Sequence, residues 1–351
     1  MILSFDFKNI CTLHKLIGIF NQSMYTTPYH PKDLSNYRFL VTGGAGFIGS
    51  HLVEYLLNFG AKKVRIIDNL SNSTLENIAP LLNSPFCEFF KGDITLPEDC
   101  KLAVAGGIDF VLHQAALGSV PRSIENPLAT HQANVTGTLN MLYAAAKASV
   151  KKFVYASSSS VYGDHPALPK QEAITGNPLS PYAASKKACE IYGYAFYESY
   201  QLSTIGLRYF NVFGPKQNPH SPYAAVVPLF AKAVLNNQAP TIFGDGMQAR
   251  DFTYIENVVQ ANIKACFATK EANGEVFNVG NQKKTTITDL AKRFIQFSGN
   301  ALEPNFVSPR KGDIKFSLAD ISKAEKLLGY QPKVAFDTGI EKTFEWYKKN
   351  I

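Results

Sequence analysis

The sequence predicts an α/β protein with a doubly wound parallel sheet and a smaller α/β domain at its C-terminal end. Short apolar runs alternate with helical patterns of about 10 to 20 residues, which is the pattern of strand–helix–strand crossovers in a parallel sheet. After about residue 211, glycine and proline pairs break the chain into shorter elements. A chain of 351 residues, 46% of them hydrophobic, can bury a full core in this way.

The expected strands of the main sheet cover residues 38–42, 64–68, 87–90, 110–113, 153–156 and 204–207. Helices between them imply right-handed crossovers and therefore a Rossmann-type domain. Helical patterns in the second part cover residues 224–236, 257–268, 288–297 and 337–349. We expect an N-terminal extension (1–36), a dinucleotide-binding domain (37–210) and a substrate domain (211–351), with residues 252–280 returning to the dinucleotide-binding domain.

Composition excludes several classes of protein. The formal charge of +7 comes from scattered basic residues without a long cationic run, which favours a small anionic ligand over nucleic acid. The five cysteines lack metal-ligand spacing and are expected to be reduced thiols in the cytoplasm, with no metal site. No apolar run approaches the roughly 20 residues that span a bilayer, so no membrane partner is expected.

A glycine-rich turn after the first strand predicts a dinucleotide site. Gly43, Gly46 and Gly49 are spaced G-x-x-G-x-x-G and lead into a helix that starts near Phe47, whose N-terminus suits a pyrophosphate. Asp68 ends the next strand, where a carboxylate accepts the ribose hydroxyls and favours NAD over NADP. The other expected cofactor contacts are Phe47, Ile48, Asn69, Asp93, Ile94, Gln114, Ala115, Ala116 and Tyr209; His113 is expected to be a packed strand-end histidine.

Tyr182 and Lys186 form the expected catalytic pair. They lie one helical turn apart on a helix that Ser180 and Pro181 open, so they share a face. A neighbouring ammonium and the positive nicotinamide ring both stabilise phenolate, which lets a tyrosine exchange a proton at neutral pH. The serine run before this helix, with Ser158 and Ser159, supplies hydroxyls for the reacting oxygen.

These motifs resemble the extended short-chain dehydrogenase/reductase family, in particular its nucleotide-sugar 4-epimerases. The resemblance runs from about Tyr37 to the C-terminus and is carried by TGGAGFIG, HQAALGSVPRSI, SSSSVYGDHPALPK, SPYAASK, LRYFNVFGP and ARDFTYIENV. It is strongest to bacterial UDP-N-acetylglucosamine 4-epimerases that supply surface-polysaccharide precursors. The resemblance implies that Tyr182 is the acid/base, Lys186 its partner and ligand of the nicotinamide ribose, and Ser158 a proton shuttle that Ser159 supports.

The resemblance also implies a set of substrate contacts. Two arginines would clamp the diphosphate, and a small residue seven positions after the second of them would admit an acetamido group at C2 of the sugar. The implied substrate residues are Ser119, Arg122, Ser158, Asn211, Ala225, Val226, Ile242, Phe243, Arg250, Arg310 and Ser317.

The resulting expectation is reversible C4 inversion of UDP-N-acetylglucosamine through a 4-keto sugar, with hydride passing to bound NAD and back. Alternatives are C4 epimerisation of UDP-glucose or of a UDP-N-acetylhexosaminuronate, for which Arg122 would be the cation. Sugar-nucleotide dehydratases or decarboxylases are a further alternative. Enzymes of that kind, however, place an acid pair or a glutamate just before V-Y-G, where this chain has Ser159 and Ser160. A homodimer through a four-helix interface is expected from the apolar helices near residues 137–147 and 183–200.

Overall fold

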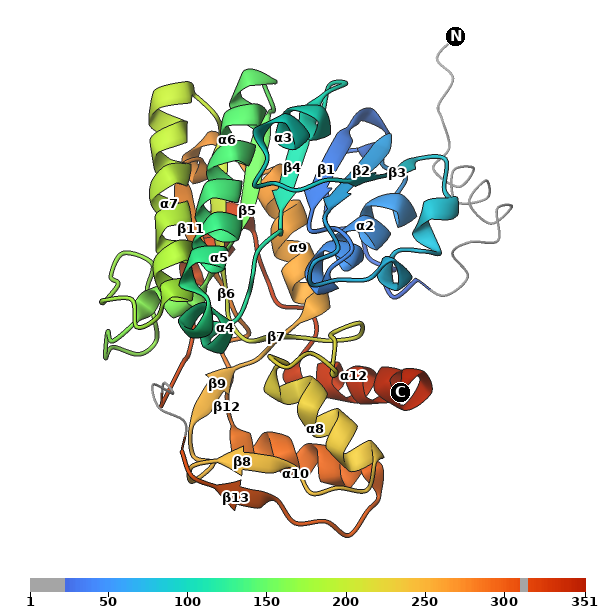
Figure 1. The fold of residues 1–351 in the computed structure, drawn as a ribbon, viewed down its shortest axis with the longest axis vertical. Coiled ribbons are helices and arrows are strands. Elements are labelled where there is room, and N and C mark those ends of the chain that lie inside the picture. The colour runs from blue at the N-terminus through green and yellow to red at the C-terminus, as the bar shows by residue number, and fades with distance from the viewer. Residues whose placement is uncertain (1–22, 310–314) are drawn as a thin grey trace.

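A single parallel sheet forms the centre of the molecule (Figure 1). The computed structural model describes residues 23–309 and 315–351. The main sheet runs in the order β11-β6-β5-β4-β1-β2-β3. Its strands are β1 (Arg38–Thr42), β2 (Lys63–Asp68), β3 (Cys87–Lys91), β4 (Phe110–His113), β5 (Lys152–Ser158), β6 (Thr204–Tyr209) and β11 (Glu275–Val279). The six predicted strands are therefore confirmed, each within two residues at either end.

Helices cover both faces of this sheet. One buried cluster contains side chains of α2 (Phe47–Asn58) and α9 (Ile255–Cys266), which pack against each other. A second cluster contains side chains of α3 (Pro97–Val104), α6 (Gly137–Lys147) and α7 (Pro181–Tyr200). The sheet order reverses between β1 and β4, and ligands of open parallel sheets bind beyond the carboxyl ends of strands at such a point.

Short elements connect these layers. Between β4 and α6 the chain forms α4 (Val120–Glu125), α5 (Pro127–His131) and the π-helix η4 (Gln132–Thr136). The 3-10 helices are η1 (Leu34–Asn36), η2 (Leu75–Asn77), η3 (Leu81–Asn83), η5 (Ser159–Tyr162) and η6 (Lys270–Ala272). Helix α11 (Ser322–Leu328) packs against β11.

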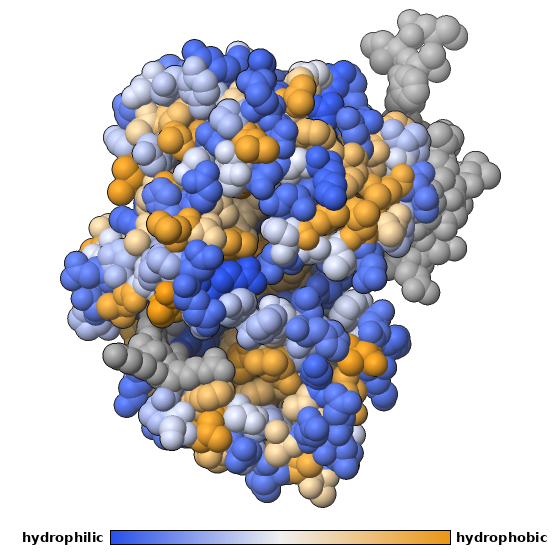
Figure 2. All heavy atoms as spheres, viewed as in Figure 1, coloured by the Kyte–Doolittle hydropathy of each residue, from blue (hydrophilic) through white to orange (hydrophobic). Residues whose placement is uncertain are grey.

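The C-terminal part contributes a smaller group of elements, below the sheet in Figure 1. Two-stranded sheets pair β7 (Val212–Phe213) with β10 (Thr253–Tyr254), β8 (Thr241–Phe243) with β13 (Asn305–Val307), and β9 (Ala249–Asp251) with β12 (Lys284–Thr286). Its helices are α8 (Val226–Leu235), α10 (Ile287–Ser298) and α12 (Phe336–Asn350). Figure 2 shows that the surface is hollowed between this group and the sheet.

Residues 252–280 were expected to return to the dinucleotide-binding domain, and their two strands lie in different sheets. Strand β11 pairs in parallel with β6 and extends that sheet. Strand β10 pairs instead with β7, because the chain leaves β6 at Asn211 with a positive φ of 31° and runs alongside residues 253–254.

The described part of the N-terminal extension packs against the Rossmann domain. Tyr25 and Tyr29 are buried, and the Tyr25 hydroxyl lies 2.9 Å from Nδ1 of His51 on α2. Tyr29 donates a hydrogen bond of 2.6 Å to Oε1 of Glu256 on α9. Residues 23–36 thus connect two helices of the same face, while the expectation for residues 1–22 lies outside the described residues.

Across residues 23–309 and 315–351, no helix combines the length and apolar character needed to cross a membrane. The same residues contain no group of three or more histidine, cysteine or acidic side chains that could hold a metal ion.

Candidate active site

The glycine turn between β1 and α2 is packed so closely against other backbone that two of its glycines could not carry a side chain. A Cβ on Gly43, whose φ is +65°, would lie 2.8 Å from the backbone of Ala115, and a Cβ on Gly49 would lie 2.2 Å from the Gly43 carbonyl oxygen. Gly46 is the N-cap of α2 and supplies no capping side chain, so the first N–H groups of α2 remain open to an anion. The partly exposed Phe47 and Ile48 form the first turn. This cradle fits the pyrophosphate of a dinucleotide.

Asp68 ends β2 beside that turn. Its Oδ2 accepts the Ala45 N–H at 3.0 Å and its Oδ1 accepts the Leu70 N–H at 2.9 Å, so the carboxylate is fixed against the glycine turn. Asn69, the next residue, donates to Oδ2 of Asp93, which follows the end of β3, at 2.9 Å. Burial opposes the charged form of Asp93, but the hydrogen bonds from Asn69 and Thr95 together outweigh it and lower the pKa of that carboxyl. The two strand ends therefore present carboxylates in the region expected for the adenosine.

Ile94 follows Asp93, and its side chain is buried against Gly137 of α6. Only its backbone is therefore placed to face a ligand.

His113 is a packed residue, as the sequence predicted. Nδ1 lies 2.8 Å from the Thr42 hydroxyl and Nε2 lies 3.0 Å from the Thr138 hydroxyl. Burial, with a smaller effect from the Lys186 charge, lowers the pKa of His113 to about 3. The imidazole is therefore neutral at physiological pH and holds the ends of β1 and β4 together.

The residues after His113 form the floor of the site. The Ala115 N–H donates to Thr42 Oγ1 at 3.1 Å, and Ala116 is partly exposed. Tyr209 donates to Oε1 of Gln114 at 3.1 Å, and the Gln114 amide donates to Oδ1 of Asn262 at 3.1 Å. Asn262 of α9 was missed by the sequence analysis, since a single asparagine in a helical pattern gives no signal.

Helix α7 presents the Tyr182 and Lys186 pair. Ser180 caps this helix by accepting the Ala183 N–H at 3.1 Å, as expected for a serine before a proline. Lys186 is 5% exposed, and its Nζ donates to the Ala156 carbonyl oxygen at 2.7 Å. That carbonyl lies on β5, two residues before Ser158 where the strand ends. The structure thus brings the expected lysine to the serine run.

The serines themselves are held by a turn. Ser158 Oγ accepts the Ser160 N–H at 3.1 Å, and Ser159 begins the 3-10 helix η5, which packs against α7. Tyr182, Ser158 and Ser159 are all partly exposed. The serine run is therefore fixed at the end of β5, next to the helix that carries Tyr182.

Asn134 is a second residue that the sequence analysis missed. It lies in the π-helix η4, and its amide donates to Ser185 Oγ on α7 at 2.9 Å. Its Oδ1 accepts the Leu117 N–H at 2.8 Å. π-Helical turns often mark functional sites, and here the turn links the loop after β4 to the catalytic helix.

A buried ion pair joins α7 to strand β6 of the main sheet. Arg208 on β6 is 1% exposed and binds Glu190 through two parallel bonds, Nε to Oε1 at 2.7 Å and Nη2 to Oε2 at 2.9 Å. Burial alone would lower the pKa of Arg208, but the Glu190 carboxylate raises it above its usual value. Ser157 donates to the same Oε1 at 2.6 Å. The pair thus fixes the residue that precedes Ser158.

On the substrate side, the expected contact Arg122 is already engaged. Ser119 caps α4 by accepting the Arg122 N–H at 3.2 Å. The Arg122 guanidinium lies 4.6 Å from the ring centroid of Tyr223 and donates to Oδ1 of Asn72 at 2.9 Å. Tyr223 also donates a hydrogen bond to Glu125. Arg122 is therefore not a free cation in this structure; it joins α4 to the loop before α8.

The expected nucleotide contacts lie on three elements of the C-terminal part. Ala225 is the exposed N-cap of α8, and Val226 is partly exposed in its first turn. The Asn211 carbonyl oxygen accepts the Thr253 N–H at 3.2 Å. Ile242 on β8 is fully buried, so its side chain packs in the core and only its backbone could face a base; Phe243 is partly exposed.

Arg250 and Ser317 lie on neighbouring backbone segments. Arg250 is on β9 and its Nη1 donates to the Ala249 carbonyl oxygen at 3.0 Å. The Ser317 N–H donates to that same carbonyl at 3.0 Å. The residue expected to clamp the diphosphate and the residue expected to border the acetamido group are thus adjacent. The second expected clamp, Arg310, lies outside the described residues.

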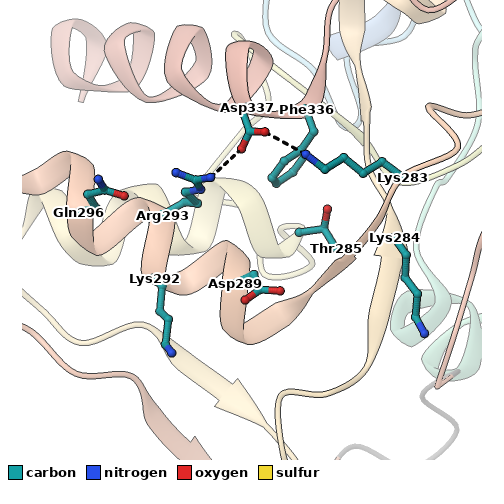
Figure 3. A pocket seen from close by; sticks show the side chains of 9 residues that line it. All are labelled: Lys283, Lys284, Thr285, Asp289, Lys292, Arg293, Gln296, Phe336 and Asp337. Atoms are coloured by element: carbon teal, nitrogen blue, oxygen red, sulfur yellow. Dashed lines mark hydrogen bonds and ion pairs between the residues drawn. The ribbon is translucent and has the colours of Figure 1, made fainter.

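A separate pocket of about 370 Å³ lies between β12, α10 and α12 (Figure 3). Asp337 forms ion pairs with Lys283 at 2.9 Å and with Arg293 at 3.2 Å. Because Asp337 pairs with both cations, their charges stabilise the packing of α12 against α10.

Comparison with known proteins identifies the family. The model of the NAD dependent epimerase/dehydratase family matches residues 39–280. The chain is 40% identical over 312 residues to a UDP-glucose 4-epimerase of Mycolicibacterium smegmatis, covering 89% of this chain and 98% of that protein. It is 36% identical over 320 residues to a UDP-glucuronate 4-epimerase of Thermodesulfobacterium geofontis, covering 89% of this chain and 97% of that protein.

A solved structure supports membership of the same family. The UDP-N-acetylglucosamine 4-epimerase of Methanobrevibacter ruminantium, in complex with UDP-N-acetylmuramic acid, superposes with a TM-score of 0.84 at 40% identity, covering 90% of this chain and 99% of that one. The glycine cradle and the Asp68 strand end fit the dinucleotide that the family uses. The chain therefore belongs to the NAD-dependent epimerase/dehydratase family, and NAD is its cofactor.

Proposed function

We propose that this protein is a UDP-sugar 4-epimerase that interconverts UDP-N-acetylglucosamine and UDP-N-acetylgalactosamine for surface-polysaccharide precursors, in the cytoplasm. The observation that carries the proposal is the junction of β5 and α7. There Lys186 is anchored to Ala156, two residues before Ser158, and both Ser158 and Tyr182 are partly exposed. The four cysteines in the described part of the chain are free thiols, as expected in a reducing compartment.

Bound NAD supplies an acceptor and donor of hydride for C4 of the sugar. The glycine turn would hold its pyrophosphate and Asp68 its adenosine ribose. Tyr182 would take the proton of the C4 hydroxyl and return it after the sugar has turned, with Ser158 hydrogen-bonded to the same oxygen. The Lys186 ammonium, fixed by the Ala156 carbonyl, would stabilise the phenolate form of Tyr182.

The two positions before Val161 favour epimerisation over elimination. Dehydration needs an additional acid, and these positions hold Ser159 and Ser160. The Ser160 hydroxyl is buried and without a hydrogen-bond partner among the described residues. A serine hydroxyl is too weak an acid to protonate a leaving hydroxide, unlike the carboxylic acids that titrate near pH 4.

Ser317 supports an acetylated sugar. It is small and fixed next to Arg250 through the Ala249 carbonyl oxygen. The uronate alternative would need a cation at the sugar carboxylate, and Arg122 is held by Asn72 and Tyr223. The neutral acetylated hexose is therefore the better match.

The test is to incubate the purified protein, without added cofactor, with UDP-N-acetylglucosamine and with UDP-glucose and to follow the sugars by proton NMR. We expect the galacto epimer chiefly from the acetylated substrate. Tyr182→Phe should abolish inversion, whereas Tyr192→Phe on the same helix is the matched control and should retain it. No inversion of either sugar, even with NAD added, would refute the proposal, and release of water or CO₂ would indicate elimination chemistry instead.

We also propose a homodimer formed through α6 and α7. Ile191 and Tyr194 are 61% and 55% exposed on α7, and Tyr143 is 49% exposed on α6. Exposed apolar side chains on two adjacent helices suit a four-helix interface with a second copy. Sedimentation should give a dimer for the wild type and a monomer for Ile191→Glu.

A further inference from the structure

The segment that carries Ser317 is fixed by backbone hydrogen bonds on both of its sides. On one side the Ser317 N–H donates to the Ala249 carbonyl oxygen at 3.0 Å. On the other side the Lys170 N–H donates to the Leu318 carbonyl oxygen at 2.8 Å, and the Asp320 N–H donates to the Lys170 carbonyl oxygen at 3.0 Å. The location of Ser317 therefore depends on what holds Lys170 in place.

Asn278 holds both of these segments at once. It is fully buried at the end of β11, and its Nδ2 donates to the Lys170 carbonyl oxygen at 2.8 Å and to the Asp320 carbonyl oxygen at 2.9 Å. Both amide hydrogens are thus used, one for each segment. Its Oδ1 accepts the Tyr162 hydroxyl at 2.6 Å, which fixes the orientation of the amide.

Tyr162 in turn belongs to the catalytic side. It ends η5, the 3-10 helix that follows Ser158. Its ring lies 4.9 Å from the guanidinium carbon of Arg208, which is bound to Glu190 on α7. A continuous set of buried contacts therefore leads from the catalytic helix through Tyr162 and Asn278 to the Ser317 segment.

We propose that Asn278 is a positioning residue for sugar specificity: it sets the distance between the Ser317 segment and the catalytic end of β5, and so the space for the substituent at C2. The proposal rests on the proposed function. An asparagine suits the position because its three partners need two donors and one acceptor. An aspartate has the same shape but would face both carbonyl oxygens with acceptors, which drives the segments apart.

The test compares kcat/KM for UDP-N-acetylglucosamine and UDP-glucose in the holoenzyme and three variants. Asn278→Asp should change the ratio of the two values by about tenfold or more, because a small misfit in a pocket discriminates by that amount. Tyr162→Phe keeps the two Asn278 donor bonds but frees the amide to rotate, and it should change the ratio by about threefold.

Asn257→Asp is the matched control. Asn257 is also fully buried, and its Nδ2 donates to the Val334 carbonyl oxygen at 2.8 Å, in the segment before α12. The ratio of the two kcat/KM values in Asn257→Asp should stay within about twofold of the wild-type ratio. An equal fall of both kcat/KM values in Asn278→Asp would overturn the inference, as would an unchanged ratio in Tyr162→Phe if Asn278→Asp does not fold. Absence of inversion in the wild type would instead refute the proposed function, and it is recognised without any variant.

Discussion

The ion pair between Arg208 and Glu190 should be among the most sensitive positions of this fold. Arg208 is 1% exposed and Glu190 is 6% exposed, and two bonds of 2.7 and 2.9 Å join them. Arg208→Met would leave the Glu190 carboxylate buried with only the Ser157 hydroxyl at 2.6 Å and Lys187 at 3.5 Å. Breaking a buried pair on one side costs about 3–5 kcal/mol, because the remaining charge is not compensated.

Removing both charges should cost less than the two single changes together. The double variant Arg208→Met, Glu190→Met carries no uncompensated charge, and replacing a buried pair by apolar groups is often nearly neutral. The free energy of unfolding can be measured by urea denaturation at a fixed, saturating NAD concentration for the wild type, both single variants and the double variant. Lys101→Met, which breaks the exposed ion pair with Glu98, is the control and should cost under about 1 kcal/mol.

Two results would refute this reasoning. The first is a loss in Arg208→Met no larger than that in the exposed control. The second is a double variant whose loss equals the sum of the single losses within about 0.5 kcal/mol, which is the behaviour of independent sites. Because Ser157 shares the Glu190 carboxylate, Arg208→Met should also lower kcat for C4 inversion at any urea concentration where it stays folded.

Three further outcomes follow from single contacts. Gly49→Ala places a Cβ 2.2 Å from a backbone carbonyl oxygen and should weaken retention of NAD, measured on the purified protein, by about tenfold, whereas Gly118→Ala meets nothing within 4 Å and should retain it. Burial raises the pKa of Asp251 from 3.8 to about 6, so the stability it contributes is complete below pH 3.8 and is lost as the pH rises through about 6. Between about pH 4 and about pH 7 the difference in unfolding free energy between Asp251→Asn and the wild type should therefore shift in favour of the variant by up to about 3 kcal/mol in urea unfolding, whatever the variant loses in hydrogen bonds at all pH values, and a constant difference would contradict the reasoning. Tyr29→Phe removes a 2.6 Å bond to the Glu256 carboxylate and should cost about 1.5–3 kcal/mol of stability without changing NAD retention.

The sequence predicted the main sheet well because its signals are local. Each strand is a short apolar run, and some helices have their own capping residue, such as Ser180 before α7. The pairing of residues 253–254 with β7 could not be predicted, because two residues carry no periodicity and β7 follows a turn at Asn211 with positive φ. Local patterns therefore predict which elements form, whereas short strands depend on tertiary contacts.

Within the candidate site, too, contacts between residues close in sequence could be predicted and contacts between distant segments could not. Tyr182 and Lys186 are four residues apart on one helix, so their spacing alone indicates that they share a face. The partners of Asn278 lie 116, 108 and 42 residues away, and no spacing in the sequence connects them. The resemblance implied that Arg122 faces the sugar, but its contacts with an aromatic ring and an amide from two other segments have no sequence signal.

These differences indicate where specificity lies in this fold. The proposed proton-transfer groups come from one strand end and one helix turn, so they can remain the same while the substrate changes. In the proposed function the space for the sugar substituent depends on Ser317, whose segment is bound to β9 on one side and to Lys170 on the other. On that proposal, a change at Ser317 alters the size of the residue in that space, but a change at Asn278 alters where the segment lies. Relatives with the same catalytic pair could therefore differ in substrate through buried polar residues that never touch the sugar.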